Sequence, residues 1–140
     1  MDIRSILVPV DGSEHSMRAA VYAADLSAVL GSELTLMYCH KPFPMFLGEP
    51  YFQAAHDRIV KKAGDLLEPY RERLKEMGVR FQERILEGPP AEAICRVAEA
   101  RKTDLVVMGS RGCTDFQGLL LGSITHRVLH MAPCPVLVIR

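Results

Sequence analysis

The feature that most constrains the fold of this chain is a regular alternation of short apolar runs with longer segments that have one apolar face. Five runs have the β-branched, apolar character of strands, and four segments between them carry apolar residues at helical spacing. We expect strands at 3–10, 33–40, 79–86, 104–109 and 134–140, and helices at 14–30, 51–77, 90–101 and 123–131. Strands and helices that alternate in this way form a parallel sheet covered by helices on both faces.

Length and composition agree with that architecture. The chain has 140 residues, of which 49% are hydrophobic, and this is enough for one domain with a substantial core. Because it contains no internal repeat, low-complexity tract or linker, we expect residues 1–140 to form a single domain. The expected fold is α/β, an open doubly wound sheet of five parallel strands in the order 3-2-1-4-5 with helices on both faces.

Three local features refine this expectation. The near-continuous apolar runs 6–10, 105–108 and 136–139 predict strands that are buried on both sides. The run 79–86 alternates more between apolar and polar residues, which predicts a strand at an exposed edge. Pro69 should kink the second helix or cut it in two, since proline lacks the backbone donor.

Charge and cysteine usage exclude several classes of function. Seventeen basic and seventeen acidic residues cancel, so the chain lacks the positive excess needed to grip nucleic acid or an anionic membrane. No apolar stretch approaches the roughly 18 residues that span a bilayer, and the N-terminus lacks the layout of a signal peptide. The four cysteines form no CxxC pair, so reduced thiols and a cytoplasmic location are expected.

Two loops are the candidates for a ligand site. The first, Asp11-Gly12-Ser13, follows the first strand, and the second, "GSRGCTDFQGLLLGS" (109–123), follows the fourth. In a sheet of order 3-2-1-4-5 these strands are neighbours at the point where the order reverses. Ligands of open α/β sheets bind at that point, beyond the carboxyl ends of the strands. Both loops would therefore border one crevice.

The second loop has the chemistry to hold phosphate. Glycine lets the backbone approach an anion closely, and unpaired backbone amides can form an anion nest. Gly122-Ser123 opens a helix whose first turn has free amides, and the Ser123 and Thr125 hydroxyls could add donors. Asp11, being an anion itself, is better suited to a sugar hydroxyl. Neither a P-loop nor GxGxxG is present, and such loops also serve as plain strand-to-helix connections, so the residues alone leave phosphate binding open.

The spacing Gly109-x2-Gly112-x9-Gly122-Ser123 resembles the G-2x-G-9x-G-S/T signature of the ATP-binding branch of the universal stress protein family. The resemblance covers the whole chain, with "ILVPVDGS" at the start, "DLVVMGSRG" before the loop and "LGSITHRVLHMAPCPVLVIR" at the end. The family fold that the resemblance implies is the same five-stranded parallel sheet. It also implies a dimer formed through the last strand.

The resemblance further implies which residues bind the nucleotide. It places adenine and ribose near Pro9, Val10 and Asp11, with a backbone contact to the base at Cys39. It places ribose and phosphates against the glycine loop and the helix that follows. The residues expected there are Met108, Gly109, Ser110, Arg111, Gly112, Gly122, Ser123, Ile124 and Thr125.

Several other polar residues allow two interpretations. His126 and His130 are four apart on a helix, but without a Glu in an HExxH pattern or a third ligand a helix-surface or dimer-interface position is the better interpretation. His15 could approach the crevice. Arg111 could reach phosphate or point into solvent. Asp115 could help to hold Mg²⁺ on the phosphates, or could simply be solvated.

Two apolar surfaces are also open to interpretation. An apolar group in the segment 41–52 could form a partner-binding patch or a lid, although packing over the sheet edge is favoured. Its members are Phe43, Phe46, Leu47, Tyr51 and Phe52. The strand at 135–140 would leave an apolar edge, and two-fold pairing of this strand in a homodimer would cover it.

The expected function is therefore a binding module that holds ATP, together with Mg²⁺, in a stress response; no metal ligand is assigned. Phosphoryl transfer needs positioned cations and an oriented nucleophile, and the sequence offers no P-loop lysine and no evident general base. We thus expect hydrolysis to be slow or absent. Two alternatives stay open: a slow ATP hydrolase or nucleotidyl transferase built on the same pocket, and an interaction protein with a vestigial pocket.

Overall fold

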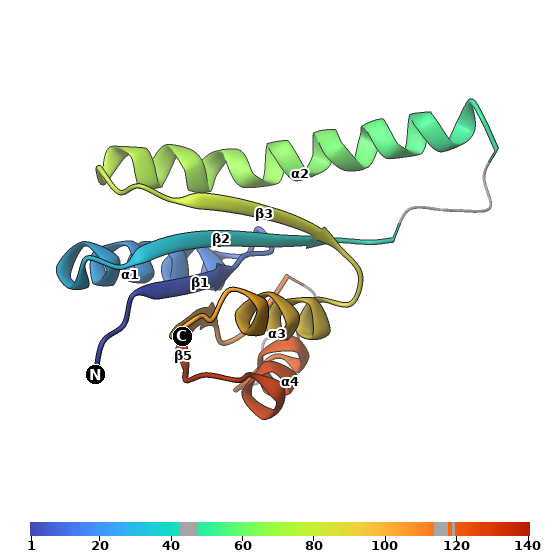
Figure 1. The fold of residues 1–140 in the computed structure, drawn as a ribbon. Coiled ribbons are helices and arrows are strands. Elements are labelled where there is room, and N and C mark those ends of the chain that lie inside the picture. The colour runs from blue at the N-terminus through green and yellow to red at the C-terminus, as the bar shows by residue number, and fades with distance from the viewer. Residues whose placement is uncertain (43–47, 114–117, 119) are drawn as a thin grey trace.

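The computed structural model describes residues 1–42, 48–113, 118 and 120–140, and strands and helices alternate along this part of the chain (Figure 1). The strands are β1 (Ser5–Pro9), β2 (Glu33–His40), β3 (Gln82–Glu87), β4 (Leu105–Gly109) and β5 (Val136–Ile139). The helices are α1 (Glu14–Leu30), α2 (Tyr51–Glu76), α3 (Pro90–Ala100) and α4 (Ser123–Met131). The sheet is parallel throughout, in the order β3-β2-β1-β4-β5, which confirms the expected fold.

All strands except β2 begin one to three residues later than the sequence predicts, and the backbone explains the differences at β3 and β5. The amide of Val79 donates to the carbonyl of Leu74 and so closes the end of α2. Because this amide is used by the helix end, Val79 does not start β3. Gly78 precedes it with φ of 70°, the left-handed conformation that commonly ends a helix. At β5, strand pairing starts at Val136, directly after Pro135, which has no amide hydrogen to donate.

We expected Pro69 to kink the second helix or to cut it in two. The cut was wrong, because α2 runs through this residue as one helix. Pro69 lies on the exposed side of α2. The carbonyl of Asp65, which would have accepted a hydrogen bond from residue 69, can be satisfied by water on that side. Exposure therefore makes the proline tolerable.

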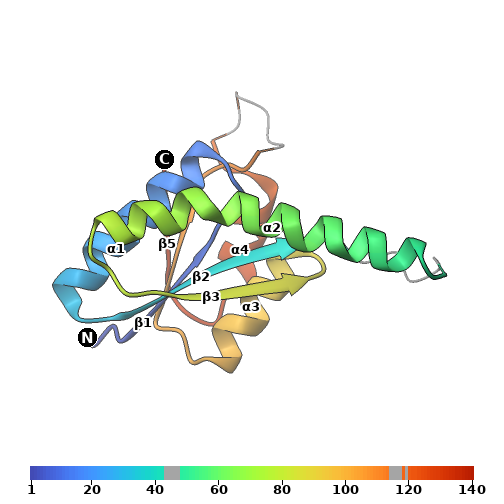
Figure 2. The same cartoon turned by 90° about the horizontal axis from the view of Figure 1, so that it is seen from above.

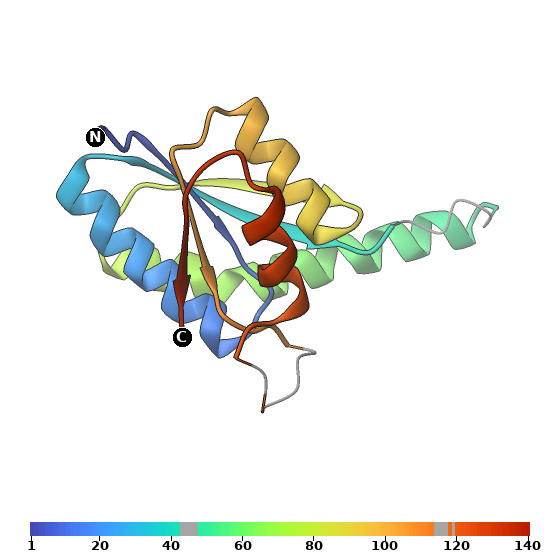
Figure 3. The same cartoon turned by 90° about the horizontal axis from the view of Figure 1, so that it is seen from below.

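The helices form two layers, one on each face of the sheet (Figure 1). On one face, alanines of α1 and the buried Leu67, Tyr70 and Leu74 of α2 pack against β1, β2 and β4. On the other face, α3 and α4 cover Leu7 and Val106 through an apolar cluster of their own. Figure 3 views this second face and shows α4 beside the C-terminal strand, with α3 next to α4.

Position in the sheet decides how deeply each strand is buried. β4 is buried along its whole length, and the three central residues of β1 are buried too. The edge prediction for the third strand is confirmed, since β3 forms one border of the sheet. The prediction that 136–139 is buried on both sides was wrong: every residue of β5 is half-buried, because β5 forms the other border and has one open side.

The connections between strands set the place where a ligand can bind. From the adjacent strands β1 and β4 the chain continues to opposite sides of the sheet, so the strand order reverses between them. Both expected loops leave the sheet there. Figure 2 shows α2 crossing above the sheet and projecting well beyond its edge. Among the described helices, none has an apolar stretch that is long enough to pass through a bilayer.

Candidate functional site

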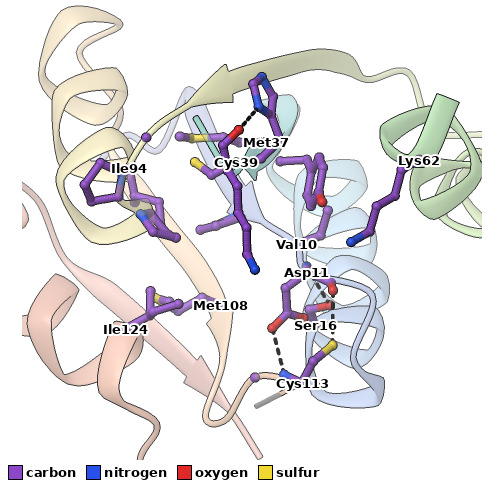
Figure 4. Close-up of a pocket in the computed structure, with 18 of the residues that line it drawn as sticks. Val10, Asp11, Ser16, Met37, Cys39, Lys62, Ile94, Met108, Cys113 and Ile124 are labelled. Atoms are coloured by element: carbon purple, nitrogen blue, oxygen red, sulfur yellow. Dashed lines mark hydrogen bonds between the residues drawn. The ribbon is translucent and has the colours of Figure 1, made fainter. Parts of the chain in front are cut away.

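A cavity of about 840 Å³ opens beyond the carboxyl ends of β1, β2 and β4 (Figure 4). Its walls come from both helix layers, with α2 on one side and α3 and α4 on the other. Ten of the thirteen residues expected to bind nucleotide line it, and they come from four separate parts of the chain. These ten are Pro9, Val10, Asp11, Cys39, Met108, Gly109, Arg111, Gly112, Ile124 and Thr125.

The remaining three expected residues lie close by but outside the lining. Ser110 is buried, and its amide donates to the carbonyl of Ile139 at 2.8 Å. Gly122 is the N-cap of α4, and Ser123 is the exposed first residue of that helix. The structure brings all thirteen to one end of the sheet, and their binding roles stay a prediction.

Local hydrogen bonds hold the Asp11 carboxylate in place at the end of β1. Its Oδ1 accepts from the amide of Ser13 at 2.9 Å, and Ser13 in turn caps α1 by accepting from the amide of Ser16. Its Oδ2 accepts from the amide of Cys113 at 3.1 Å. Each carboxylate oxygen has a second lone pair. A hydroxyl group of a ligand can therefore still donate to Asp11.

Tyr70 of α2 anchors the same loop, a role that sequence reasoning missed. The amide of Gly12 donates to the Tyr70 hydroxyl at 3.0 Å, and that hydroxyl also shares a hydrogen bond with Ser16. Burial is the main reason why the pKa of Tyr70 is raised, so the hydroxyl keeps its proton. Gly12 has φ of 88°, and a Cβ there would lie 3.3 Å from a methyl carbon of Leu66. No periodicity in the sequence pairs position 70 with position 12.

The backbone amides of the glycine loop are less available than the sequence suggested. We expected unpaired amides after the fourth strand, and this was wrong for three of them. The amide of Gly122 donates to the carbonyl of Ser110, while those of Ser110 and Cys113 donate to Ile139 and Asp11. Ser110 and Gly122 are buried, and buried amides need acceptors, which here are carbonyls of β5 and of the loop itself. This part of the loop is no ready-made anion nest.

The first turn of α4 keeps donors for an anion. The first backbone hydrogen bond of the helix runs from the amide of His126 to the carbonyl of Gly122, so the amides of Ile124 and Thr125 precede it. Both residues line the cavity. The Thr125 hydroxyl is used differently from the expectation, since it is buried and donates to the carbonyl of Gly109 at 2.8 Å.

Gly109 has a packing role that the sequence did not reveal. A Cβ at this position would lie 2.8 Å from the carbonyl carbon and the Cβ of His15, in the first turn of α1. No real side chain fits at that distance without displacing α1. Glycine at the end of β4 thus lets α1 approach the sheet, whatever it also does for a ligand.

The far wall of the cavity is apolar. Met37, Cys39 and Met108 lie over the strand ends, and Ile94 of α3 and Ile124 of α4 close this side (Figure 4). Burial raises the pKa of the Cys39 thiol to about 11, so it stays neutral near pH 7. This wall offers a flat aromatic group dispersion contacts and no charge.

Cys113 lies at the mouth of the cavity, beside Asp11 (Figure 4). Its Sγ donates to the Asp11 carbonyl at 3.1 Å. Burial, with a smaller contribution from the Asp11 charge, raises the pKa of Cys113, so the thiol remains a donor. Two hydrogen bonds therefore connect the second loop to the first.

His15 lies next to the cavity but does not line it. Its ring nitrogens are 3.0 Å from a guanidinium nitrogen of Arg18 and 3.1 Å from one of Arg111. Arg111 is among the residues that line the cavity, and its contact with phosphate stays a prediction. Burial, followed by the charges of Arg18 and Arg111, lowers the pKa of His15.

Sequence reasoning also missed three cations in the cavity wall. Arg58 and Lys62 come from α2, and Lys41 follows β2. The helical repeat could have indicated two of them, since Arg58 and Lys62 are four residues apart and share a face with the cavity-lining Ile59. Only the tertiary structure shows that this face borders the strand ends.

The other candidates are resolved in part. His126 and His130 are exposed on α4 with ring centroids 4.7 Å apart, and no group of three or more His, Cys, Asp or Glu in the described ranges could hold a metal ion. Tyr51 is exposed and Phe52 half-buried at the start of α2. The remaining candidates, Asp115 and the apolar residues Phe43, Phe46 and Leu47, lie outside the described residues.

Comparisons with known proteins agree with this geometry. The sequence profile of the Universal stress protein family matches residues 2–140. The chain is 39% identical over 138 residues to a Thermus aquaticus protein named Universal stress protein in QAH/OAS sulfhydrylase 3'region, with 98% of each chain covered. The solved structure of universal stress protein UspA from Lactobacillus plantarum superposes with a TM-score of 0.85 at 26% identity, covering 100% of this chain and 99% of that one. A universal stress protein described as in complex with cAMP has a TM-score of 0.78 at 24% identity, with 100% and 99% covered, a likeness of fold alone.

Proposed function

The chain belongs to the universal stress protein family, and on that premise we propose that it binds adenine nucleotides, ATP foremost, in the cavity beyond β1 and β4. The observation that carries the proposal is the convergence of ten expected residues, from the ends of β1, β2 and β4 and the start of α4, on one cavity of about 840 Å³. That volume is within the range of small-molecule sites.

The residues suggest a place for each part of the nucleotide. The apolar wall of Met37, Ile94 and Met108 suits the base, and Asp11 has lone pairs for the ribose hydroxyls. The amides that open α4, at Ile124 and Thr125, suit the phosphates because the helix N-terminus also carries a partial positive charge. A protein of the same fold is described as bound to cAMP, which is consistent with this assignment.

Calorimetry tests the proposal. Titration of ATP with Mg²⁺ into micromolar protein should give saturable heat. Gly122→Val should abolish it, because a branched side chain at the N-cap would occupy the space above the first amides of α4. Gly118→Val is the matched control in the same loop, since a Cβ there meets nothing within 4 Å. Both variants should be checked for folding by thermal unfolding; a heat signal in Gly122→Val equal to that of the wild type would contradict the proposed site.

Two further measurements address the alternatives. Native mass spectrometry of gently purified protein reports a co-purified nucleotide, which would contradict a vestigial pocket. Phosphate release from the same samples distinguishes a holding site from a slow hydrolase, for which Gly122→Val provides the background.

We also propose a homodimer paired through β5, acting in a stress response in the cytoplasm. The dimer is supported by the half-buried edge that β5 leaves at one border of the sheet. Family membership supports the role in a stress response, and a cytoplasmic location accords with the free thiols at all four cysteines.

A further inference from the structure

The cavity has a strong excess of positive charge in a chain whose net charge is zero. Among the residues that the structure describes, four basic side chains line it, Lys41, Arg58, Lys62 and Arg111, and one carboxylate, that of Asp11. The described part of the lining thus has three more basic than acidic side chains. Positive charges gathered around a concave surface attract an anionic ligand.

This excess is concentrated away from the glycine loop. Arg58 and Lys62 lie one helical turn apart on α2, and Lys62 reaches from α2 into the cavity, on the side of Val10 and Asp11 (Figure 4). The first turn of α4, where we place the phosphates, belongs to the opposite helix layer. A ligand between them would meet positive charge from both sides.

The side chains of Arg58 and Lys62 have no described acidic partner that would neutralise them. Within the described part of the chain neither is in an ion pair, although both lie on a helix that carries several acids. Asp11, the one acid among the described residues of the lining, already accepts from two backbone amides.

We propose that Lys62, together with Arg58, forms a second anion-binding wall that contacts the phosphate chain from the α2 side. This inference rests on the proposed nucleotide site and adds what determines its specificity. Affinity should then rise with the number of phosphates, since a triphosphate can reach both the α4 amides and the α2 cations while a monophosphate is too short to bridge them. The cations of α2 select the length of the phosphate chain. Asp11 and the apolar wall select the nucleoside.

The experiment is a matched pair of charge reversals on α2. Lys62→Glu changes a residue of the lining, and Lys61→Glu makes the same change in net charge at an exposed position outside it. AMP, ADP and ATP are titrated into both variants and the wild type. We expect Lys62→Glu to weaken ATP binding by about tenfold or more and AMP binding by less than about threefold, with Lys61→Glu within about twofold for both. Arg58→Gln should give a smaller loss of the same kind.

The outcomes separate this inference from the proposed function. If the wild type binds adenine nucleotides but Lys62→Glu weakens AMP as much as ATP, or no more than Lys61→Glu does, the α2 wall is overturned and the nucleotide site stands. Failure of the wild type to bind any of the three would overturn both. Both lysines are exposed, so the variants should fold, and equal melting temperatures check this.

Discussion

At the scale of single residues, the positions that matter are those where two distant segments come into contact. Gly109 ends β4, and His15 lies in the first turn of α1, nearly a hundred residues away, yet the two backbones touch. His15 also connects the guanidinium groups of Arg18 and Arg111. Such contacts leave no periodic trace in the sequence, but each makes a measurable prediction.

Gly109→Ala should destabilise the protein. The new Cβ would lie 2.8 Å from atoms of His15 that belong to or adjoin the backbone, so α1 must shift. Overpacking of this kind costs about 1–3 kcal/mol of unfolding free energy, measured by urea denaturation. Gly118→Ala is the control, because its Cβ would enter open space and should change stability by less than about 0.5 kcal/mol. Equal stability of the two variants would show that α1 yields without cost.

His15 should make stability depend on pH. Burial, then Arg18 and then Arg111, lowers its pKa below the ordinary 6.5, although Glu14 and Asp11 oppose this. As the pH falls through 6.5, the unfolded chain gains a proton that the folded chain takes up only at lower pH. Stability is thus lost between 6.5 and the lower folded pKa, and is regained as the pH rises.

Urea unfolding at about pH 7.5 and about pH 5.5 checks this. His15→Gln should lose less stability than the wild type on acidification, while His130→Gln, at an exposed position on α4, should behave like the wild type. The assignment to His15 fails if all three proteins lose the same amount.

At the scale of elements, α2 contributes to the cavity in two ways. It does so although it follows β2, which is neither of the two strands, β1 and β4, between which the strand order reverses. Its buried face carries Tyr70, which holds the loop after β1, and its outer turns carry the cations that line the cavity. A helix that only covered the sheet would need neither. The position of α2 therefore couples the packing of one layer to the geometry of the cavity.

Tyr70→Phe tests the first role. It removes the hydroxyl that accepts from the Gly12 amide and bonds to Ser16, leaving both without this partner inside the fold. We expect a loss of about 1–3 kcal/mol of unfolding free energy. ATP binding should also weaken, because the loop that carries Asp11 is less firmly held. Tyr22→Phe, at an exposed tyrosine of α1, should leave both quantities unchanged; a similar loss there would remove the case for Tyr70 as an anchor.

At the scale of the whole molecule, β5 is the feature that points beyond one chain. The carbonyls of Pro135 and Ile139 accept hydrogen bonds from the β4 side. Because successive residues of a strand direct their backbone groups to alternate sides, the amides and carbonyls of Val136 and Val138 point to the open side. An open edge of this kind can pair with a second copy about a two-fold axis.

Val138→Pro should weaken the proposed dimer. Proline removes an outward-pointing amide hydrogen, a change that edge strands tolerate better than central ones. Sedimentation equilibrium should show a larger share of monomer for Val138→Pro than for Val138→Thr, which keeps the amide. If the wild type itself sediments as a monomer, or the two variants do not differ, β5 is not the interface.

Much of the fold could be read from the sequence because the pattern that specifies it is local. Each apolar run is a strand and each segment with a helical repeat is a helix, since the burial of one face demands that spacing. The edge position of β3 followed from its weaker apolar character for the same reason. Two loops at the reversal of strand order then predicted a ligand site between β1 and β4, where the structure has a cavity.

The tertiary structure alone decided what those loops do with their hydrogen bonds. It showed the amides of Ser110, Gly122 and Cys113 already paired, Gly109 needed for the approach of α1, and a cationic wall supplied by α2. Each of these depends on two segments far apart in the chain. Local spacing specifies which face of an element is buried, whereas the identity of its neighbour follows only from how the elements pack together.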